Sequence, residues 1–329
     1  MTSACVSVVI CGYADDRWDD LLTAVESVRA QSVPPREIIV VIDHNPSLRA
    51  RAQAVMPDVT VIENRDPRGL SGARNSGVAV AKGEVIAFLD DDAVAAPDWL
   101  ERLRAHYEQD PTVLGVGGAI DPAWSDGPPQ WFPEEFYWVV GCTYRGMPQT
   151  VGQVRNLIGA NMSFRRQVFE GVGEFRSGIG RIDKRPFGCE ETELCIRAHR
   201  HWPDRIFLYD PAARIRHRVP HARARWGYFR ARCYAEGRSK AQVTRLAGAR
   251  DGLETERGYT LRTLPQGMAR GIVAATRGDA AGLARAGAIA AGLAITLVGY
   301  AEGLVRSRWQ GTGRAAGPRA DVIHGGITE

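Results

Sequence analysis

The N-terminal part of the chain alternates short apolar runs with amphipathic segments. Residues 6–13 and 37–45 are rich in β-branched side chains and end in polar or turn residues, which is typical of strands. Between them, residues 19–33 place leucines and valines at helical spacing, so the three segments predict a strand–helix–strand unit. The pattern continues with a strand over 60–64, a helix over 70–83 and a fourth strand over 84–89. This order predicts an α/β fold with a mostly parallel central sheet, whose ligands lie beyond the carboxyl ends of the strands.

Three carboxylates, Asp90, Asp91 and Asp92, directly follow the fourth predicted strand. Clustered carboxylates repel one another and favour a hard divalent cation such as Mg²⁺ or Mn²⁺, which can share its remaining coordination positions with substrate phosphates. Asp43 ends the second strand and is expected at the same crevice. Acidic runs after strands also occur as solvated turns or helix caps, so the triplet alone leaves both interpretations open.

Several segments in order resemble the family 2 glycosyltransferases with the GT-A fold, from about residue 5 to about residue 220. The segments are ICGYADD, VIDHNP, GLSGARNSGVAVAKGEVIAFLDDD, IGANMSFRR and CEETELCIRA. The resemblance implies a Rossmann-like nucleotide-diphospho-sugar transferase fold with a C-terminal helical extension. It is closest to the subgroup that builds lipid-linked or surface glycans.

The resemblance implies donor-side roles for five residues. Asp43 matches the aspartate that reads the nucleotide base, and Arg74 would lie beside the nucleotide. Asp90 and Asp92 match the paired-aspartate motif, with Asp92 as the better metal ligand and Asp90 on the ribose or uracil side as well as near the metal. Asp91, in the middle place, stays a donor-binding candidate. The alternatives are a strand-end turn for Asp43 and a surface helix position for Arg74.

The acceptor side requires a general base that removes a proton from the attacking hydroxyl. The family places this carboxylate second in a Glu-Asp pair, which corresponds here to Glu190 and Glu191, so Glu191 is the expected base. Glutamate replaces the usual aspartate and adds one methylene, which leaves Glu190 as the other candidate. The competing interpretation is favourable charge in the first turn of a helix. Trp131 and Asn161 are expected to bind the acceptor, although core packing is an alternative for Trp131.

His217 occupies the place where many GT-A enzymes offer a histidine to the metal or the diphosphate. An imidazole suits Mn²⁺. The alternative is a surface histidine in an arginine-rich strand end. The Gly-rich, basic stretch 175–188, with Arg181 and Lys184, is expected either to close over a diphosphate or to be an exposed connector.

Composition fits one large α/β domain with an appendage. The chain has 329 residues, of which 44% are apolar, and its net charge of +4 does not indicate a nucleic-acid-binding surface. The six cysteines show no CxxC pair, and no signal peptide is expected, so the sequence predicts reduced thiols and a cytoplasmic location. We expect a catalytic domain over 1–220, with a nucleotide-sugar half over about 1–120 and an acceptor half over about 121–220.

The chain changes character beyond residue 220. Residues 223–245 interleave arginines with aromatic residues, which suits an anionic membrane surface, while a solvated helix is the alternative. Residues 286–301 form an uncharged apolar run that is shorter than the roughly 20 residues of a comfortable membrane span, so a buried or interfacial hairpin is expected. We therefore predict a helical extension over 221–310, peripheral contact of residues 221–305 with the cytoplasmic face of a membrane, and a disordered tail over 311–329.

These features favour an inverting glycosyltransferase that uses a nucleotide-diphosphate sugar, expected to be a UDP-sugar, with a divalent metal and a glycan or lipid-linked acceptor. A sugar nucleotidyltransferase is one alternative, but it would need a Gly-rich phosphate loop with an early Arg or Lys near the first strand, and ICGYADD has none. A non-catalytic glycan- or lipid-binding module that keeps the fold is the other.

Overall fold

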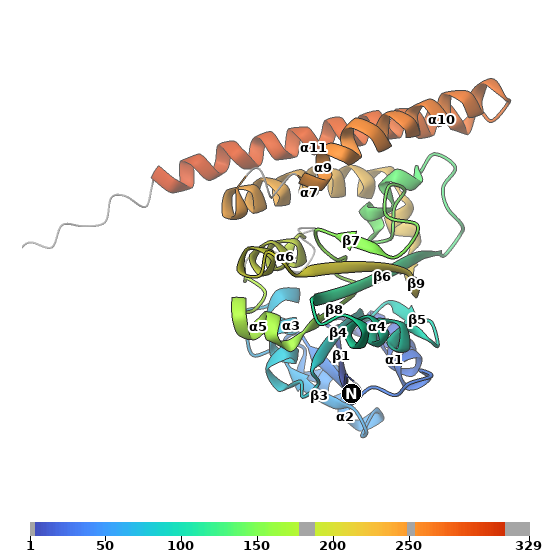
Figure 1. Ribbon diagram of the computed structural model, residues 1–329. Coiled ribbons are helices and arrows are strands. Elements are labelled where there is room, and N and C mark those ends of the chain that lie inside the picture. Colours follow the sequence, from blue (N-terminus) through green and yellow to red (C-terminus); the bar gives the residue numbers. More distant parts are fainter. Residues whose placement is uncertain (1–3, 178–187, 249–253, 313–329) are drawn as a thin grey trace, which may run out of the picture.

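The structure is a computed structural model, and it describes residues 4–177, 188–248 and 254–312. A mixed sheet with helices on both faces forms the body of the molecule, and the C-terminal helices lie together on one side of it (Figure 1).

The secondary-structure elements alternate between strands and helices in the first half of the chain. The elements of the catalytic part are β1(Val6–Gly12), η1(Asp15–Arg17), α1(Trp18–Arg29), β2(Glu37–Ile42), α2(Pro46–Val55), β3(Thr60–Glu63), α3(Leu70–Val80), β4(Val85–Asp90), β5(Ala93–Ala95), α4(Trp99–Gln109), β6(Val113–Trp124), η2(Glu134–Val140), β7(Gly152–Val154), β8(Asn161–Arg165), α5(Arg166–Val172), α6(Glu190–His201) and β9(Ile206–Val219). The C-terminal elements are η3(His221–Ala224), α7(Trp226–Ala247), α9(Glu254–Gly258), the π-helical η4(Tyr259–Thr263), α10(Leu264–Thr276) and α11(Ala281–Thr312).

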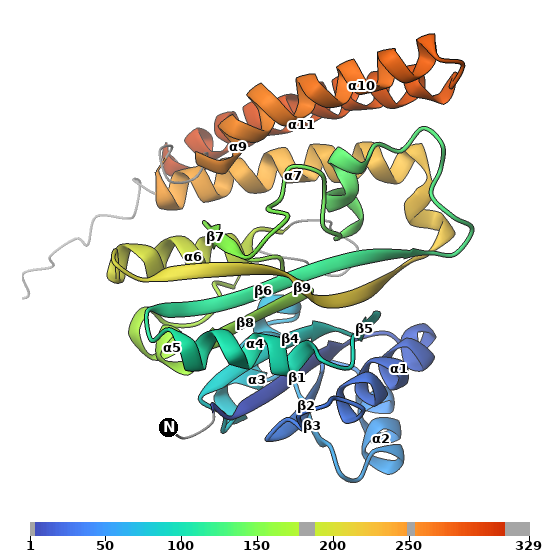
Figure 2. The ribbon, with the colours of Figure 1, turned by 45° about the vertical axis from the view of Figure 1, so that its right-hand side comes forward.

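The nine strands form one sheet with a parallel half and a more antiparallel half. Their order is β3-β2-β1-β4-β8-β6-β9-β5, and β7 pairs with β9. The first four strands of this order run parallel, as the sequence predicts. β8 runs antiparallel to both of its neighbours, whereas β6 and β9 pair in parallel as two long strands beside it (Figure 2). The prediction of a mostly parallel sheet therefore holds for the half formed by β1, β2, β3 and β4 only.

The central strand β1 is apolar along its length because both of its faces are covered. Val8 and Ile10 belong to one core cluster together with residues of α1, α2 and α4. Val9 points to the opposite cluster, which contains residues of α3, α5 and α6. A strand buried on both sides reads as a continuous apolar run rather than as an alternation. This rigid layer fixes the positions of the strand ends that carry the acidic residues.

The C-terminal helices pack onto the catalytic part. Phe229 of α7, Leu264 of α10 and Ile289 of α11 belong to the same apolar cluster as β1. α10 and α11 form a helical hairpin, and α7 lies between this hairpin and the sheet (Figures 1 and 2).

The apolar run 286–301 is part of a longer helix than the sequence predicts. α11 has 32 residues, because the Ala- and Gly-rich residues on both sides of the run, together with Arg285 and Glu302, are also helical. By length and composition, one helix of the described chain could cross a membrane: residues Ala281–Val305, with a mean hydropathy of 1.7. The expected tail lies outside the described residues except for 311–312, which are helical.

Candidate active site

The acidic residues gather at one edge of the sheet because the strands that carry them are parallel. Cys11 of β1 lies in register with Val41 of β2 on one side and with Asp90 of β4 on the other. The carboxyl ends of these strands therefore meet, and Asp43 and the triplet 90–92 border the same edge.

Asp43 is a buried carboxylate that two protein groups hold in place. The side-chain amide of Asn64 donates to its Oδ1 at 2.6 Å, and the backbone N–H of Gly69 donates to its Oδ2 at 3.0 Å. Each carboxylate oxygen has a further lone pair, so Asp43 can still accept a hydrogen bond from a ligand. Its contact with a nucleotide base stays a prediction.

Three basic side chains surround the buried carboxylate of Asp92. Arg17 forms ion pairs with Asp92 and with Oδ1 of Asp91, the latter at 2.9 Å. Nε2 of His217 lies 3.1 Å from Oδ1 of Asp92, and a guanidinium nitrogen of Arg223 lies 3.5 Å from its Oδ2. His217 reaches this place because β5, which directly follows the triplet, pairs with β9.

The neighbouring acids Asp91 and Asp92 have opposite protonation preferences. Burial raises the pKa of Asp91 well above its ordinary value, although Arg17 opposes the shift. Burial also acts to raise the pKa of Asp92, but His217, Arg17 and Arg223 outweigh it and hold that pKa well below its ordinary value. Asp92 is therefore the ionised member and the stronger ligand for a cation.

Asp90, Asp92 and His217 form a group that can hold a divalent metal ion. One ligand atom of each lies within 4.8 Å of the others. Oδ1 of Asp92 is buried and lies 3.1 Å from Nε2 of His217, so a carboxylate oxygen and an imidazole nitrogen, which can both be metal ligands, lie side by side. Two carboxylates and an imidazole suit Mn²⁺ or Mg²⁺. This geometry supports the predicted use of a divalent metal, whereas the assignment of Asp90, Asp92 and His217 as its ligands stays a prediction. Asp91, which pairs with Arg17, is not in this group.

Arg74 joins the metal side of the site to the start of α6. Its guanidinium nitrogens lie 2.7 Å from Oε1 of Glu190 and 3.5 Å from Oδ1 of Asp90, and one of them donates to the carbonyl of Gly159 at 3.0 Å. The side chain is 3% exposed, so the interpretation of Arg74 as a surface helix residue is wrong. Its three contacts lie at the end of β4, in the segment before β8 and at the start of α6, so they bring the two predicted halves of the site together.

Glu190 and Glu191 differ in their surroundings although they are adjacent. Glu190 is buried and paired with Arg74, whereas Glu191 is half-buried and has no ion pair with another described residue. Burial and the negative charge of Glu190 raise the pKa of Glu191 to about 8. A carboxylate with a raised pKa accepts a proton more readily, so Glu191 has the properties of a general base.

Replacing Arg74 by leucine is expected to lower the free energy of unfolding by about 3 kcal/mol, because a buried carboxylate at Glu190 would lose its cation. Urea unfolding of the variant measures this, with Arg216→Leu on the exposed side of β9 as the control. The double variant Arg74→Leu/Glu190→Leu should recover part of the loss. Equal stability of the Arg74 and Arg216 variants would contradict this account.

The two predicted acceptor residues lie in different surroundings. Asn161 is fully buried: its amide donates to the carbonyls of Ala119 and Ala213, and its Oδ1 accepts from the indole of Trp99. It therefore ties strands together, and its polar atoms already have protein partners. Trp131 is partly buried among aromatic rings, in edge contact with Trp226 of α7. A role for either residue in acceptor binding stays a prediction.

Comparisons with known proteins identify the family. The model of "Glycosyl transferase family 2" matches residues 7–173. A glucosyl-dolichyl phosphate glucuronosyltransferase of Haloferax volcanii is 38% identical over 238 residues, which cover 71% of this chain and 76% of that protein. This chain belongs to glycosyl transferase family 2. Another similar protein is the succinoglycan biosynthesis protein ExoM of Rhizobium meliloti, which is 24% identical over 72% of this chain and 74% of that protein.

Solved structures agree with this transferase in fold. The mannosyltransferase PcManGT of Pyrobaculum calidifontis, solved with GDP-Man and Mn²⁺, aligns with a TM-score of 0.58 at 19% identity, covering 94% of this chain and 88% of that one. GalNAc-T7, solved with UDP, GalNAc and Mn²⁺, aligns with a TM-score of 0.51 at 17% identity over 79% of this chain. The transferase spans 56% of the GalNAc-T7 chain. The predicted GT-A fold is confirmed.

Sequence reasoning missed two arginines of the transferase's site. Arg17 directly follows the ICGYADD segment and reaches the acidic triplet. The Gly-rich phosphate loop of a nucleotidyltransferase is still missing from this segment. Arg223 lies just past β9, where the sequence suggested only a membrane contact. The position of Arg17 was visible in the sequence, but its partners were not.

Most of the basic loop predicted to close over a diphosphate lies outside the described residues. Arg181 and Lys184 of that loop lie outside the described residues. Of its arginines, Arg176 is described, and its guanidinium lies 2.8 Å from Glu193 of α6.

Proposed function

We propose that this transferase moves a sugar from a nucleotide-diphosphate sugar to a hydroxyl of a lipid-linked glycan, with inversion at the anomeric carbon. The observation that carries the proposal is the Arg74 bridge. Its buried guanidinium contacts both the half-buried Asp90 of the metal group and the buried Glu190 beside the expected base. Donor and acceptor chemistry would therefore meet at the edge formed by β1, β2 and β4.

The residues divide into a donor side and an acceptor side. Asp43 would accept a hydrogen bond from the nucleotide base. Asp90, Asp92 and His217 would hold a divalent metal, which when bound offsets the charge of the leaving diphosphate. Arg17 and Arg223 already face this group and would add positive charge near the phosphates.

Glu191 would act on the acceptor. It takes the proton of the acceptor hydroxyl as that oxygen forms a bond to the anomeric carbon. At the same time the bond between that carbon and the diphosphate oxygen breaks, and its electron pair stays on the leaving diphosphate. Because the hydroxyl attacks from the face opposite the leaving group, the configuration inverts. Glu190 pairs with Arg74, and its negative charge adds to the effect of burial in raising the pKa of Glu191.

The nature of the substrates follows from the relatives only. The Haloferax volcanii relative is named for transfer of a glucuronosyl group to glucosyl-dolichyl phosphate. We therefore infer a UDP-sugar donor, with UDP-glucuronic acid as the first to test, and a dolichyl-phosphate-linked acceptor at the cytoplasmic face of a membrane.

A donor panel tests the proposal. Purified protein with Mn²⁺ is mixed with UDP- and GDP-sugars, and its melting temperature and the release of nucleotide diphosphate are measured. One donor is expected to raise the melting temperature and to release diphosphate slowly without acceptor. The anomeric configuration of the product is then read by NMR with a short glycolipid acceptor. A protein that neither binds nor turns over any donor in the panel would instead support the non-catalytic binding module.

A further inference from the structure

α11 presents an uninterrupted apolar face to solvent. Between Leu283 and Val305, all of which the structure describes, every exposed residue is apolar. The face consists of four alanines, one glycine and the large residues Leu283, Leu297, Val298 and Val305, whose exposures lie between 55% and 61%. At about 100° per residue, these four side chains fall within an arc of about 100°, so they form one stripe. We refer to the exposed residues of 283–305 as the α11 face; it is about 33 Å long.

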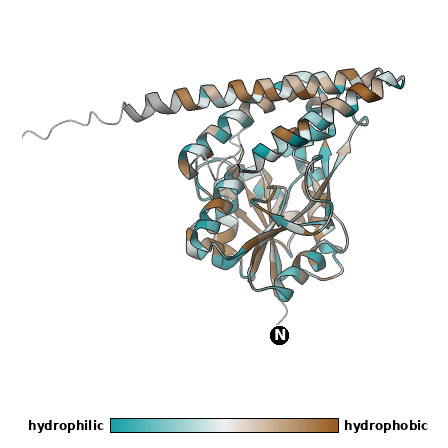
Figure 3. Ribbon diagram, turned by 45° about the horizontal axis from the view of Figure 1, so that its top comes forward, coloured by the Kyte–Doolittle hydropathy of each residue, from teal (hydrophilic) through white to brown (hydrophobic). Residues whose placement is uncertain are grey.

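The opposite side of α11 is fixed to α7 by direct backbone contact. A Cβ added at Gly237 of α7 would lie 2.0 Å from the carbonyl oxygen of Thr296, and one added at Gly299 would lie 2.2 Å from that of Tyr234. No larger side chain fits at either crossing, so the helices are close-packed. α7 in turn lies on the catalytic part, and the α11 face therefore points away from it. Figure 3, which looks toward these helices, shows apolar residues recurring along the coloured part of α11.

This packing favours a helix that lies along a membrane over one that crosses it. α11 is long enough to cross, but α7 runs beside it and carries Arg238, Lys240 and Arg245. A crossing α11 would take these charges into the hydrocarbon or would have to break the glycine contacts, and both are unfavourable. A helix with one apolar face and a protein-covered opposite face fits the boundary between headgroups and acyl chains.

The charge of the extension is complementary to an anionic bilayer. Residues 221–305 carry 13 Lys and Arg and 6 Asp and Glu, a net charge of +7. The whole chain has a net charge of +4, so the remaining residues together have −3. Arg257, Arg262 and Arg277, near the α10–α11 hairpin, are exposed. Positive charge is thus concentrated in the same segment as the α11 face.

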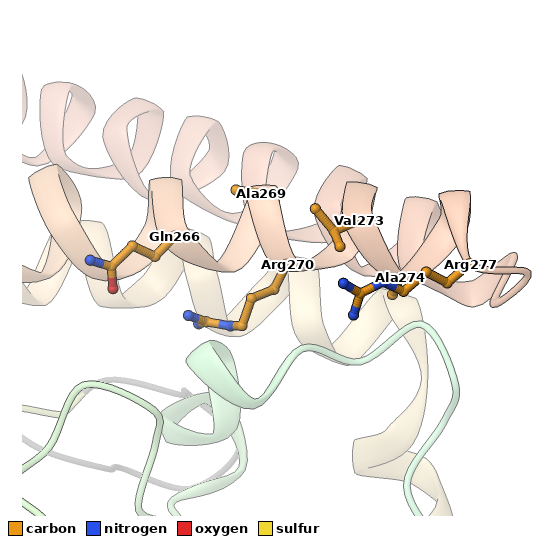
Figure 4. A pocket seen from close by; sticks show the side chains of 6 residues that line it. All are labelled: Gln266, Ala269, Arg270, Val273, Ala274 and Arg277. Carbon is orange, nitrogen blue, oxygen red and sulfur yellow. The ribbon is translucent and has the colours of Figure 1, made fainter.

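The borders of the α11 face match this orientation. Figure 4 shows Arg270 of α10 extending toward the catalytic part, where it pairs with Glu135 at 2.5 Å, so this charge does not interrupt the apolar side. On the other border, an apolar cavity of about 280 Å³ lies between α11 and the indoles of Trp131 and Trp226. Tryptophans are favoured at membrane interfaces. Arg223 contacts Asp92, and Trp226 of the cavity lies three residues later in the chain. One short segment therefore contributes to both the cavity and the surroundings of the metal group.

We propose that the α11 face is a membrane-contact surface and that α11 lies in the plane of an anionic bilayer without crossing it. The inference rests on the proposed function in one respect: a lipid-linked acceptor makes this location useful. In this orientation the cavity at Trp131 and Trp226, which borders α11, would lie near lipids of the same bilayer.

Vesicle binding tests the surface. Full-length protein is floated with phosphatidylcholine vesicles with or without phosphatidylglycerol. Wild type is expected to float with anionic vesicles, less so at high salt. Leu297→Glu should weaken the partitioning about tenfold or more, because it places a charge in the apolar stripe. The matched control is Val55→Glu at the end of α2, where the side chain is 53% exposed against 56% for Leu297. A wild-type protein that stays soluble beside anionic vesicles at low salt, or equal effects of both variants, overturns the proposal.

Depth measurements distinguish the in-plane helix from a crossing one. Spin-labelled non-canonical residues at Leu283, Ala294 and Val305 should report equal depths if α11 lies in the plane. A label at Ala294 much deeper than the other two would show a crossing helix and overturn the proposal. Light scattering without lipid gives the remaining outcome: a dimer that Leu297→Glu converts to monomer would assign the face to a second copy instead.

Donor turnover and vesicle binding, measured on the same preparations, test the proposed function and the membrane surface independently. Diphosphate release from the donor in solution requires the metal group but not the α11 face. Intact donor turnover without vesicle binding rejects the membrane surface only. Vesicle binding without any donor turnover rejects the proposed function only.

Discussion

Replacing Asp92 by asparagine is expected to reduce sugar transfer by about 10³-fold or more and to abolish metal-dependent donor binding. The variant keeps the shape of the side chain but removes a carboxylate that its surroundings hold ionised. Loss of metal-based charge stabilisation costs several kcal/mol in the transition state, and each 1.4 kcal/mol corresponds to about tenfold in rate. Initial transfer rates, together with calorimetric titration of Mn²⁺ and donor, measure the effect.

The control for this variant must separate loss of the metal from loss of the fold. Asp92 also forms ion pairs with Arg17 and Arg223, so its removal leaves these guanidinium groups without that shared carboxylate. Circular dichroism and the melting temperature therefore accompany each rate. Asp121→Asn, at an exposed ion pair with Arg214, should change neither rate nor metal binding. A wild-type rate that is insensitive to thorough chelation would show that the enzyme needs no metal at this group.

The first half of the fold could be predicted because its signals are local. The runs predicted as strands at 6–13, 37–45, 60–64 and 84–89 appear as β1, β2, β3 and β4 with shifts of a few residues at their ends. β1, β2 and β4 are buried by the helices packed on the sheet, so most of their side chains must be apolar whatever the rest of the chain does. The parallel order of these strands follows from the helices between them.

The second half could not be predicted in the same way. β6 contains Gly115, Gly117 and Gly118, which weaken its own strand preference, and it is held by pairing with β8 and β9. A Cβ at Gly115 would lie 2.8 Å from the carbonyl oxygen of Ser163, so close approach of the neighbouring strand requires glycine there. Such pairing depends on tertiary context, which no window of sequence contains.

In the site, too, the sequence indicated the candidate residues but not their interaction partners. The acids at strand ends were visible, because their positions follow from the strands. The partner of Glu190 is Arg74, 116 residues earlier in the chain. Arg17 and its partner Asp91 are also far apart in the sequence. Ion pairs of this kind form only when the sheet edge and α6 are assembled. Sequence alone could therefore name candidate groups but not the bridge that connects them.

Replacing Glu191 by glutamine is expected to lower kcat by about 10²- to 10⁴-fold while the affinity for the donor changes little. Glutamine keeps the size of the side chain but cannot accept the proton of the acceptor hydroxyl. In the wild type the base must be ionised, and its pKa is raised to about 8. The rate at saturating donor should therefore rise with pH up to about 8 and then level off. The rate of Glu191→Gln should lack this step.

Protein stability supplies a second, independent measurement of the same group. A carboxyl group whose pKa is higher in the folded than in the unfolded state binds more protons when folded, so the free energy of unfolding falls as pH rises between the two pKa values. For Glu191 this window runs from 4.5, its ordinary value, to about 8. Glu191→Gln should remove this part of the pH dependence and become relatively more stable at the alkaline end.

Glu190→Gln is the matched comparison, since it breaks the ion pair with Arg74 and should lower stability without removing the proton acceptor. If instead Glu190→Gln eliminates the pH step in the rate and Glu191→Gln preserves it, the general base is Glu190 and not Glu191.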